Sequence, residues 1–237
     1  MLSGIIKQII VITDGQSNQG GCPVAAATRA RGAGITVSAV GILDSGRLGD
    51  KGAVEVSRIA EAGGGIHHLV PVRELAYTIS GITVQTTQLT VRQQADRKLL
   101  QLTGMSLNQF PPEVRSTILP YIARQEEEAE VHIALVLDTS GSMLQKRAEL
   151  EDSIKDLVVS LDSRKGPVKL AIVQYPGRKG RGVVIKSLYG DNSVTLKVLE
   201  QMVYGGFTPT GPAIDLAAGV LTGSTGIQGN DSVVAVK

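Results

Sequence analysis

The sequence predicts an α/β fold with three layers: an open, mostly parallel sheet with one antiparallel edge strand and helices on both faces. Short runs of branched apolar residues alternate along the chain with segments of helical spacing, which is typical of strands joined by crossover helices. Several runs end in small polar loops. With 2 Phe and no Trp among 237 residues, the core has to be aliphatic, which suits buried parallel strands.

The first third of the chain alternates strand and helix. Glycine pairs and triplets separate the segments, as expected where helices stop and strands begin. We expect strands at 5–12, 35–43 and 66–70 and helices at 23–31 and 52–62, with a further helix starting at 73–80.

Residues 83–129 lack strand alternation and show helical spacing instead. We expect one helix at 89–102 and a second that carries Val114, Ile118 and Ile122 at intervals of four, with Pro120 as a possible kink. We interpret this region as a helical connector between two α/β halves.

The last third returns to the α/β pattern. The strand at 131–137 and the helix at 145–161 are followed by a strand pair that forms the antiparallel edge. That pair is expected at 168–174 and 182–189, then helices at 194–203 and 212–221 and a short strand at 233–236.

Composition argues against several classes of protein. A formal net charge of +2 favours neither nucleic acid nor membrane as a partner, and the basic run at 177–182 is interpreted as a solvated turn. Cys22 is the only cysteine, so no intrachain disulfide can form. No apolar run reaches the roughly 18 residues of a membrane span, and no signal peptide is recognised, so we expect a cytoplasmic protein.

The most informative polar loop follows the strand at 131–137. Asp138, Ser140 and Ser142 stand at alternate positions, so their side chains can converge on one point. Oxygen ligands of this kind suit a hard cation such as Mg²⁺ or Mn²⁺. An ordinary helix entry, in which Asp or Ser caps free N–H groups, explains this loop equally well.

Two further loops can reach the same place. Thr208 lies in the Gly-rich loop at 205–211, and Asp14 follows the strand at 5–12. Loops at the carboxyl ends of parallel strands gather at one edge of the sheet. Alone, Thr208 could be a helix cap and Asp14 a turn residue, whereas together the three loops offer an oxygen-only metal site.

These three segments, DTSGSM at 138–143, GGFTPTG at 205–211 and VITDG at 11–15, resemble the signatures of the von Willebrand factor A (VWA) domain. The resemblance implies a Rossmann-like fold with a metal-ion-dependent adhesion site for Mg²⁺ or Mn²⁺. Its hydroxyl ligands would bind the ion directly, its carboxylates would act largely through water or hydrogen bonds, and a partner protein would supply an Asp or Glu carboxylate. The implied ligands are Asp138, Ser140, Ser142, Thr208 and Asp14.

The order of these segments departs from the usual domain, because Asp14 precedes Asp138 instead of following Thr208. We therefore expect one circularly permuted VWA domain, as in VWA proteins of spore-forming Gram-positive bacteria. The former C-terminal half is 1–82, the connector 83–129 and the former N-terminal half 130–237. We favour a monomer. A dimer that exchanges halves, or a segment cut from a tandem array, would also supply each element once.

The function expected from this site is metal-dependent protein binding, without enzyme activity. The sequence lacks the phosphate-binding loop G-x-x-x-x-G-K-[ST] and the hydrolase motif G-x-S-x-G. A metal-assisted hydrolase is the alternative, since a bound ion can activate water. A structural scaffold with a vestigial site is the third.

Overall fold

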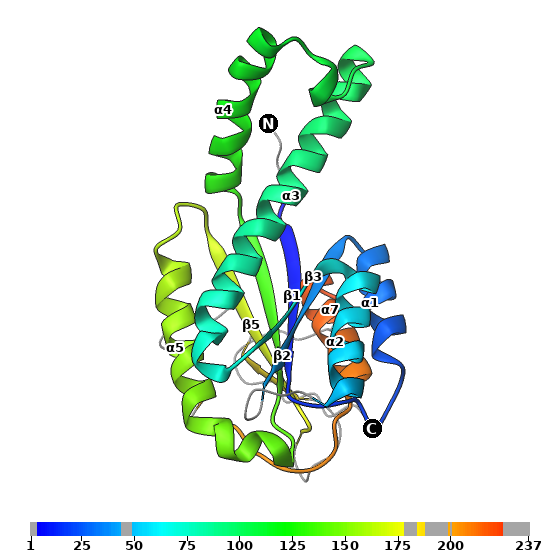
Figure 1. The fold of residues 1–237 in the computed structure, drawn as a ribbon, viewed down its shortest axis with the longest axis vertical. Coiled ribbons are helices and arrows are strands. Elements are labelled where there is room, and N and C mark those ends of the chain that lie inside the picture. Colours follow the sequence, from blue (N-terminus) through cyan, green and yellow to red (C-terminus); the bar gives the residue numbers. More distant parts are fainter. Residues whose placement is uncertain (1–3, 44–48, 178–183, 188–198, 200, 225–237) are drawn as a thin grey trace.

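One open sheet forms the centre of the protein (Figure 1). The computed structural model describes residues 4–43, 49–177, 184–187, 199 and 201–224. The sheet has the order β3-β2-β1-β4-β5-β6, parallel except for the antiparallel β5–β6 pair. Its strands are β1 (Ile6–Thr13), β2 (Ile35–Ile42), β3 (Gly64–Val70), β4 (Val131–Asp138), β5 (Val168–Tyr175) and β6 (Val184–Ser187). The predicted α/β class with one antiparallel edge strand is confirmed.

The central strands are apolar on both faces, as expected from runs in which polar and apolar residues do not alternate. In β4, Ile133 and Leu135 belong to the core on one face, whereas Ala134 and Val136 belong to the core on the other. All eight residues of β4 are buried. Such a strand is stable only between two layers of helices.

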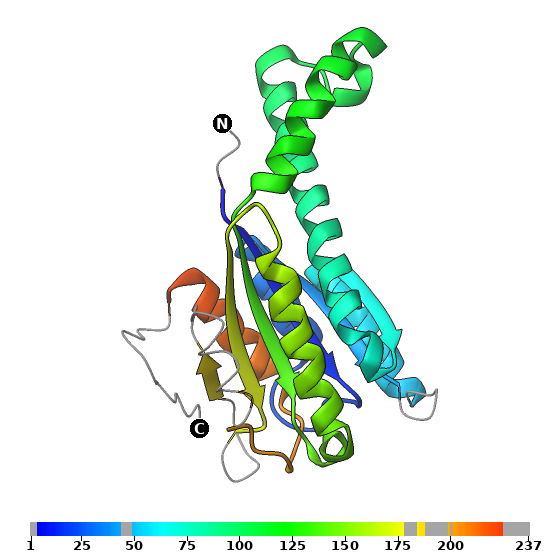
Figure 2. The ribbon, with the colours of Figure 1, turned by 90° about the vertical axis from the view of Figure 1, so that its left-hand side faces the viewer.

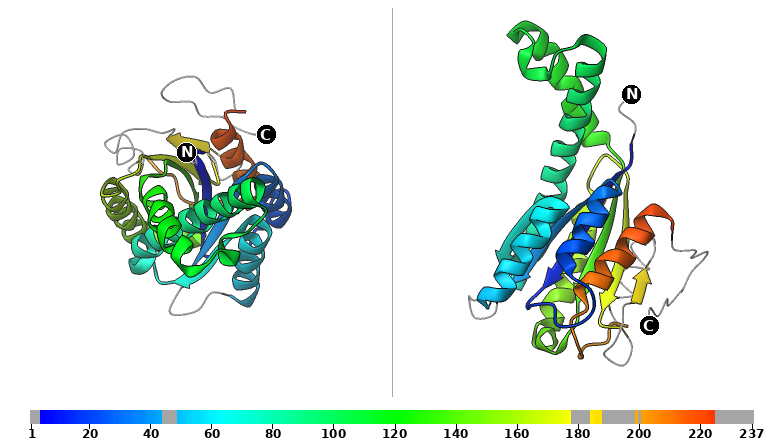
Figure 3. Two further views of the ribbon diagram at one scale, coloured as in Figure 1. Left: turned by 90° about the horizontal axis from the view of Figure 1, so that it is seen from above. Right: turned by 90° about the vertical axis from the view of Figure 1, so that its right-hand side faces the viewer.

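Helices cover both faces (Figures 2 and 3). The helices α1 (Pro23–Gly32), α2 (Asp50–Gly63) and α7 (Thr210–Thr222) pack on one side, and α3 (Leu75–Thr103) and α5 (Arg147–Asp162) on the other. Alanines of α1 and α7 let these two helices lie close to the sheet and to each other. The predicted layers are therefore present.

The region between the two α/β parts contains two long helices. The second part of α3 and the helix α4 (Pro112–Glu128) extend from one end of the sheet and form a helical hairpin (Figure 1). The short 3-10 turn η2 (Leu107–Gln109) lies between the two helices. Pro120 lies inside α4. The Arg92 guanidinium on α3 pairs with the Glu126 carboxylate on α4 at 2.8 Å, which holds the hairpin together near the sheet.

Our prediction of separate helices at 73–80 and 89–102 was wrong, because α3 is one continuous helix of 29 residues. Gly81 and several β-branched threonines weaken the intrinsic helix propensity of the intervening segment. Contacts with the sheet compensate: Gln8 of β1 donates to the Thr83 carbonyl at 3.4 Å and to Thr87 Oγ1 at 3.3 Å. The sheet thus stabilises this helix where its own sequence does not.

The two predicted halves meet in the middle of the sheet, where β1 pairs with β4 in parallel from Ile6 opposite Val131 to Ile12 opposite Leu137. The predicted strand at 233–236 and most of the predicted helix at 194–203 lie outside the described residues. Among the helices that the structure describes, none has the length and apolar character needed to cross a membrane.

Candidate metal centre

Asp138 ends β4 and is fully buried. Thr13 Oγ1, at the end of the neighbouring β1, donates to Asp138 Oδ2 at 2.7 Å, and the Ser140 N–H donates to Oδ1 at 2.8 Å. Burial raises the pKa of the Asp138 carboxyl to about 6, and these two hydrogen bonds oppose that rise. The carboxylate is thereby held in one orientation by neutral donors.

The two serines and Asp14 continue from this point as a chain of hydrogen bonds. Ser140 Oγ lies 3.2 Å from Ser142 Oγ, and Ser142 Oγ donates to Asp14 Oδ1 at 2.6 Å. These residues belong to two loops that are 128 positions apart in the sequence. Four of the five predicted ligands are therefore gathered in one place.

Thr208, the fifth predicted ligand, is held in the same group of loops through its backbone. Its N–H donates to Asn18 Oδ1 at 2.8 Å, and its carbonyl accepts from Ser17 Oγ at 3.1 Å, so the Thr208 loop is bound to the Asp14 loop. The Gly205 N–H donates to the Thr139 carbonyl at 2.8 Å, which binds it to the Asp138 loop as well. Gly205 has φ 116°, a conformation that L side chains rarely adopt.

Sequence reasoning missed Lys146. Its ammonium donates to Asp14 Oδ2 at 2.7 Å and to the Ser142 carbonyl at 3.3 Å, and only 11% of the Lys146 side chain is exposed. The signal available was spacing: Lys146 follows Ser142 by four residues, and the 3-10 turn η3 (Gly141–Lys146) returns the chain to the same side. Thr13 was also missed, although it directly precedes Asp14.

The donor set fits a hard divalent ion. It consists of two carboxylates and three hydroxyls, all oxygen, as Mg²⁺ and Mn²⁺ prefer. The 3.2 Å between the two serine oxygens is close to the roughly 3 Å that separates neighbouring ligands in a magnesium octahedron. Among the described residues, no group of three or more His, Cys, Asp and Glu side chains is placed to hold a metal, so the candidate centre depends on its hydroxyls.

The charged side chains around the candidate centre nearly balance one another. Among the described residues of the site, Lys146 offsets one of the two carboxylates, which leaves one net negative charge. A divalent ion bound there would turn the local charge positive. Such a site would favour an additional anionic ligand.

Comparison with known proteins identifies the family of this chain. A family model described as the von Willebrand factor type A domain matches residues 2–82. The uncharacterized protein YabS of Bacillus subtilis is 32% identical over 216 residues, which cover 90% of this chain and 88% of YabS. This chain belongs to the VWA family. The VWA match itself covers the segment with Asp14 and not those with Asp138 and Thr208.

A solved structure is similar to this chain over nearly its whole length. The crystal structure of an uncharacterized protein from Alicyclobacillus acidocaldarius is 37% identical, with a TM-score of 0.87, and the match covers 93% of this chain and 95% of that one. The match leaves out few residues of this chain, fewer than half the number in the helical hairpin. Most of the hairpin is therefore part of the shared architecture.

Proposed function

We propose that this VWA domain is a divalent-metal-dependent protein-binding module without enzyme activity. Asp138, Ser140, Ser142, Thr208 and Asp14 would hold Mg²⁺ or Mn²⁺, and the ion would capture an Asp or Glu carboxylate of a partner protein. The main support is that three loops from distant parts of the sequence are hydrogen-bonded to one another with these side chains among them.

The roles of the individual ligands follow from their surroundings. Ser140 and Ser142 present neighbouring hydroxyl oxygens with no charge of their own, so they would neutralise little of the ion's charge. Asp138 is occupied by Thr13 and the Ser140 N–H, and its role is to orient the loop and offer negative charge at short range. Asp14 is shared with Lys146. An ion held this way keeps much of its charge for an external carboxylate.

The hydrolase alternative would need a general base in addition to the ion. The two carboxylates at the site are both committed: Asp138 accepts from Thr13 and Ser140, and Asp14 accepts from Ser142 and Lys146. This arrangement favours binding over water activation. We also propose that the domain is a circularly permuted monomer with no nucleic-acid or membrane partner, in agreement with β1 and β4 pairing within one chain.

The first test is thermal and urea unfolding in EDTA, Mg²⁺ and Mn²⁺, for the natural chain and for Asp138→Ala. An ion that binds only the folded state stabilises it by about 2.7 kcal/mol at 100 times its Kd. We expect this stabilisation for the natural chain and its loss in the variant. Asp152→Ala, which removes an exposed carboxylate on α5, is the matched control and should keep the full metal response.

Partner chemistry is tested on the same proteins. A peptide library carrying Asp or Glu should bind only with Mg²⁺ or Mn²⁺ present, and the corresponding Asn or Gln peptides should not bind. Equal stabilisation of the natural chain and Asp138→Ala by the ions would contradict the proposed site. Metal-dependent cleavage of a phosphoester or peptide bond would instead favour the hydrolase.

A further inference from the structure

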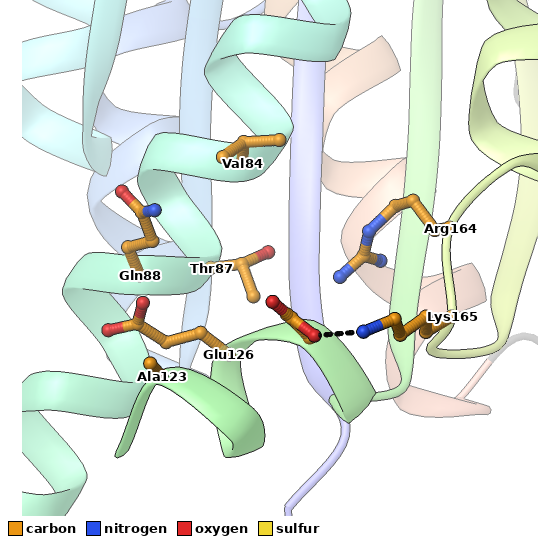
Figure 4. A pocket seen from close by; sticks show the side chains of 8 residues that line it. Val84, Thr87, Gln88, Ala123, Glu126, Arg164 and Lys165 are labelled. Atoms are coloured by element: carbon orange, nitrogen blue, oxygen red, sulfur yellow. Dashed lines mark hydrogen bonds and ion pairs between the residues drawn. The ribbon is translucent and has the colours of Figure 1, made fainter. Parts of the chain in front are cut away.

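An open cavity lies at the opposite end of the sheet from the metal centre, where the helical hairpin joins the rest of the domain (Figures 1 and 4). It has a volume of about 360 Å³, within the size range of small-molecule sites. Three segments line it: α3 with Val84 and Thr87, α4 with Ala123 and Glu126, and the loop between α5 and β5 with Arg164.

Arg164 is the unusual member of this lining. Its side chain is half-buried, and its Nη1 atom is shielded from solvent without a hydrogen-bond partner. Among the residues that the structure describes, no carboxylate pairs with it. Burial lowers the pKa of Arg164, and no neighbouring charge opposes this effect. A guanidinium group in such a place favours a planar anion such as a carboxylate or a phosphate.

The other charges around the cavity already have partners. Lys165 pairs with Glu127, and Glu126 accepts from Arg92 on α3 at 2.8 Å. Figure 4 shows the Glu126 carboxylate directed away from Arg164, whereas the Arg164 guanidinium extends from the opposite wall toward the Thr87 hydroxyl. Within the described part of the chain, the cavity therefore keeps one positive charge that no acidic group offsets.

The wall that carries Arg164 is held in place by its neighbours. A Cβ atom on Gly166 would come within 2.3 Å of the Ala129 carbonyl oxygen, so the α5–β5 loop lies directly against the end of α4. The Val131 N–H donates to the Pro167 carbonyl at 2.9 Å on the same side. Opposite, Thr87 is bonded both to its own helix and to Gln8 of the sheet. The cavity is thus formed by fixed segments.

We propose that this cavity binds a small organic anion whose carboxylate or phosphate group pairs with Arg164 and whose short apolar body lies against Val84 and Ala123. The Thr87 hydroxyl lies on the same side of the cavity but is already bonded to the Thr83 carbonyl and to Gln8, so it forms part of the wall and Arg164 provides the polar contact. The ligand would contact both helices of the hairpin and the sheet domain at once. This site is independent of the proposed metal-dependent function, since it lies at the other end of the strands.

The test measures thermal unfolding and calorimetric binding with inorganic phosphate and with succinate, against sodium chloride at equal ionic strength. EDTA is present throughout, so that no divalent ion can bring an anion to the metal centre. Four proteins are compared: the natural chain, Arg164→Gln, Ala123→Leu and Arg97→Gln. Ala123→Leu fills the cavity from an exposed position on α4, and Arg97→Gln removes an exposed guanidinium on α3 outside the cavity.

At least one of the two anions should bind the natural chain, and its affinity for Arg97→Gln should be the same. Arg164→Gln should weaken it about 10- to 100-fold, as expected for the loss of charge-assisted hydrogen bonds, and Ala123→Leu should abolish it. Equal binding by Arg164→Gln, or no binding of either anion to the natural chain, would overturn the proposal. Loss in Arg164→Gln with full binding in Ala123→Leu would also overturn it, because the anion would then lie outside the cavity.

Discussion

Neighbouring strands β1 and β4 both end in a loop with an aspartate, and the two carboxylates have opposite surroundings. Asp138 is fully buried and accepts only from neutral donors, the Thr13 hydroxyl and the Ser140 N–H. The Asp14 carboxylate accepts from Ser142 on one oxygen and from the Lys146 ammonium on the other. The same residue type thus orients a loop in one strand and balances charge in the other.

The difference between the two carboxylates determines how much negative charge each can offer to a metal ion. A carboxylate that faces neutral donors keeps its negative charge available to a metal ion, whereas one that faces an ammonium shares it. The ammonium of Lys146 and a bound cation would both interact with the same carboxylate. The strength of metal binding should therefore depend on Lys146, which no ligand motif contains.

The largest expected effect comes from breaking the Asp14–Lys146 pair in EDTA. Asp14→Asn removes the carboxylate that accepts from the nearly buried Lys146 ammonium and should cost about 2 to 3 kcal/mol of unfolding free energy. Adding Lys146→Met should recover much of that loss. Urea unfolding followed by circular dichroism measures both, since the chain has no tryptophan.

The exposed pair between Lys155 and Asp152 on α5 provides the control for this cycle. Asp152→Asn should cost no more than about 0.5 kcal/mol, because solvent screens that pair. If Asp14→Asn were as mild as Asp152→Asn, the pair at the site would carry no special energy, and the contrast with Asp138 would disappear.

An intermediate effect is expected on the Asp138 side. Thr13→Val keeps the shape of the side chain but removes the hydroxyl that donates to Asp138, so a buried carboxylate oxygen loses its partner. We expect a loss of about 1 to 2 kcal/mol in urea unfolding. Thr90→Val removes a hydroxyl that donates to the Thr86 carbonyl within α3 and is the matched control. Equal costs for the two variants would contradict the orienting role of Thr13.

The smallest effect concerns Glu55 on α2, whose carboxylate accepts from the Ser17 N–H at 2.7 Å and so supports the Asp14 loop. Burial raises the pKa of Glu55, and the Ser17 hydrogen bond partly opposes this. Protonation is therefore favoured in the folded state, and the resulting stability is present at low pH and lost as pH rises through the folded pKa.

Glu55→Gln should remove that dependence. Relative to the natural chain, the variant should gain stability between about pH 4 and pH 7, by less than about 0.5 kcal/mol because the group is only half-buried. Urea midpoints at several pH values measure the difference. A change of the opposite sign would mean that the Ser17 hydrogen bond outweighs burial.

The sheet and most of its helices could be predicted from the sequence because periodicity and glycine breaks are local signals. The runs at 5–12, 35–43 and 131–137 correspond to β1, β2 and β4 within a residue or two at each end. The five predicted ligands stay predictions as a metal site, although the fold brings their loops together.

What could not be predicted depends on contacts between distant segments. The continuity of α3 comes from its packing on the sheet, including the bonds of Gln8 to Thr83 and Thr87, which no local propensity contains. Lys146 has a side chain typical of a solvated helix face, and only the position of Asp14 makes it part of the site. The cavity at Arg164 needs three segments at once.

The length of α3 has a mechanical consequence. Its 29 residues form a rod of about 43 Å, and its first turns cover the sheet while its last turns stand in the hairpin. A helix bends little over this distance, so a force applied at the hairpin tip is delivered to the layer beside β1 as a torque. A displacement of the hairpin tip would therefore move the first turns of α3 against the sheet.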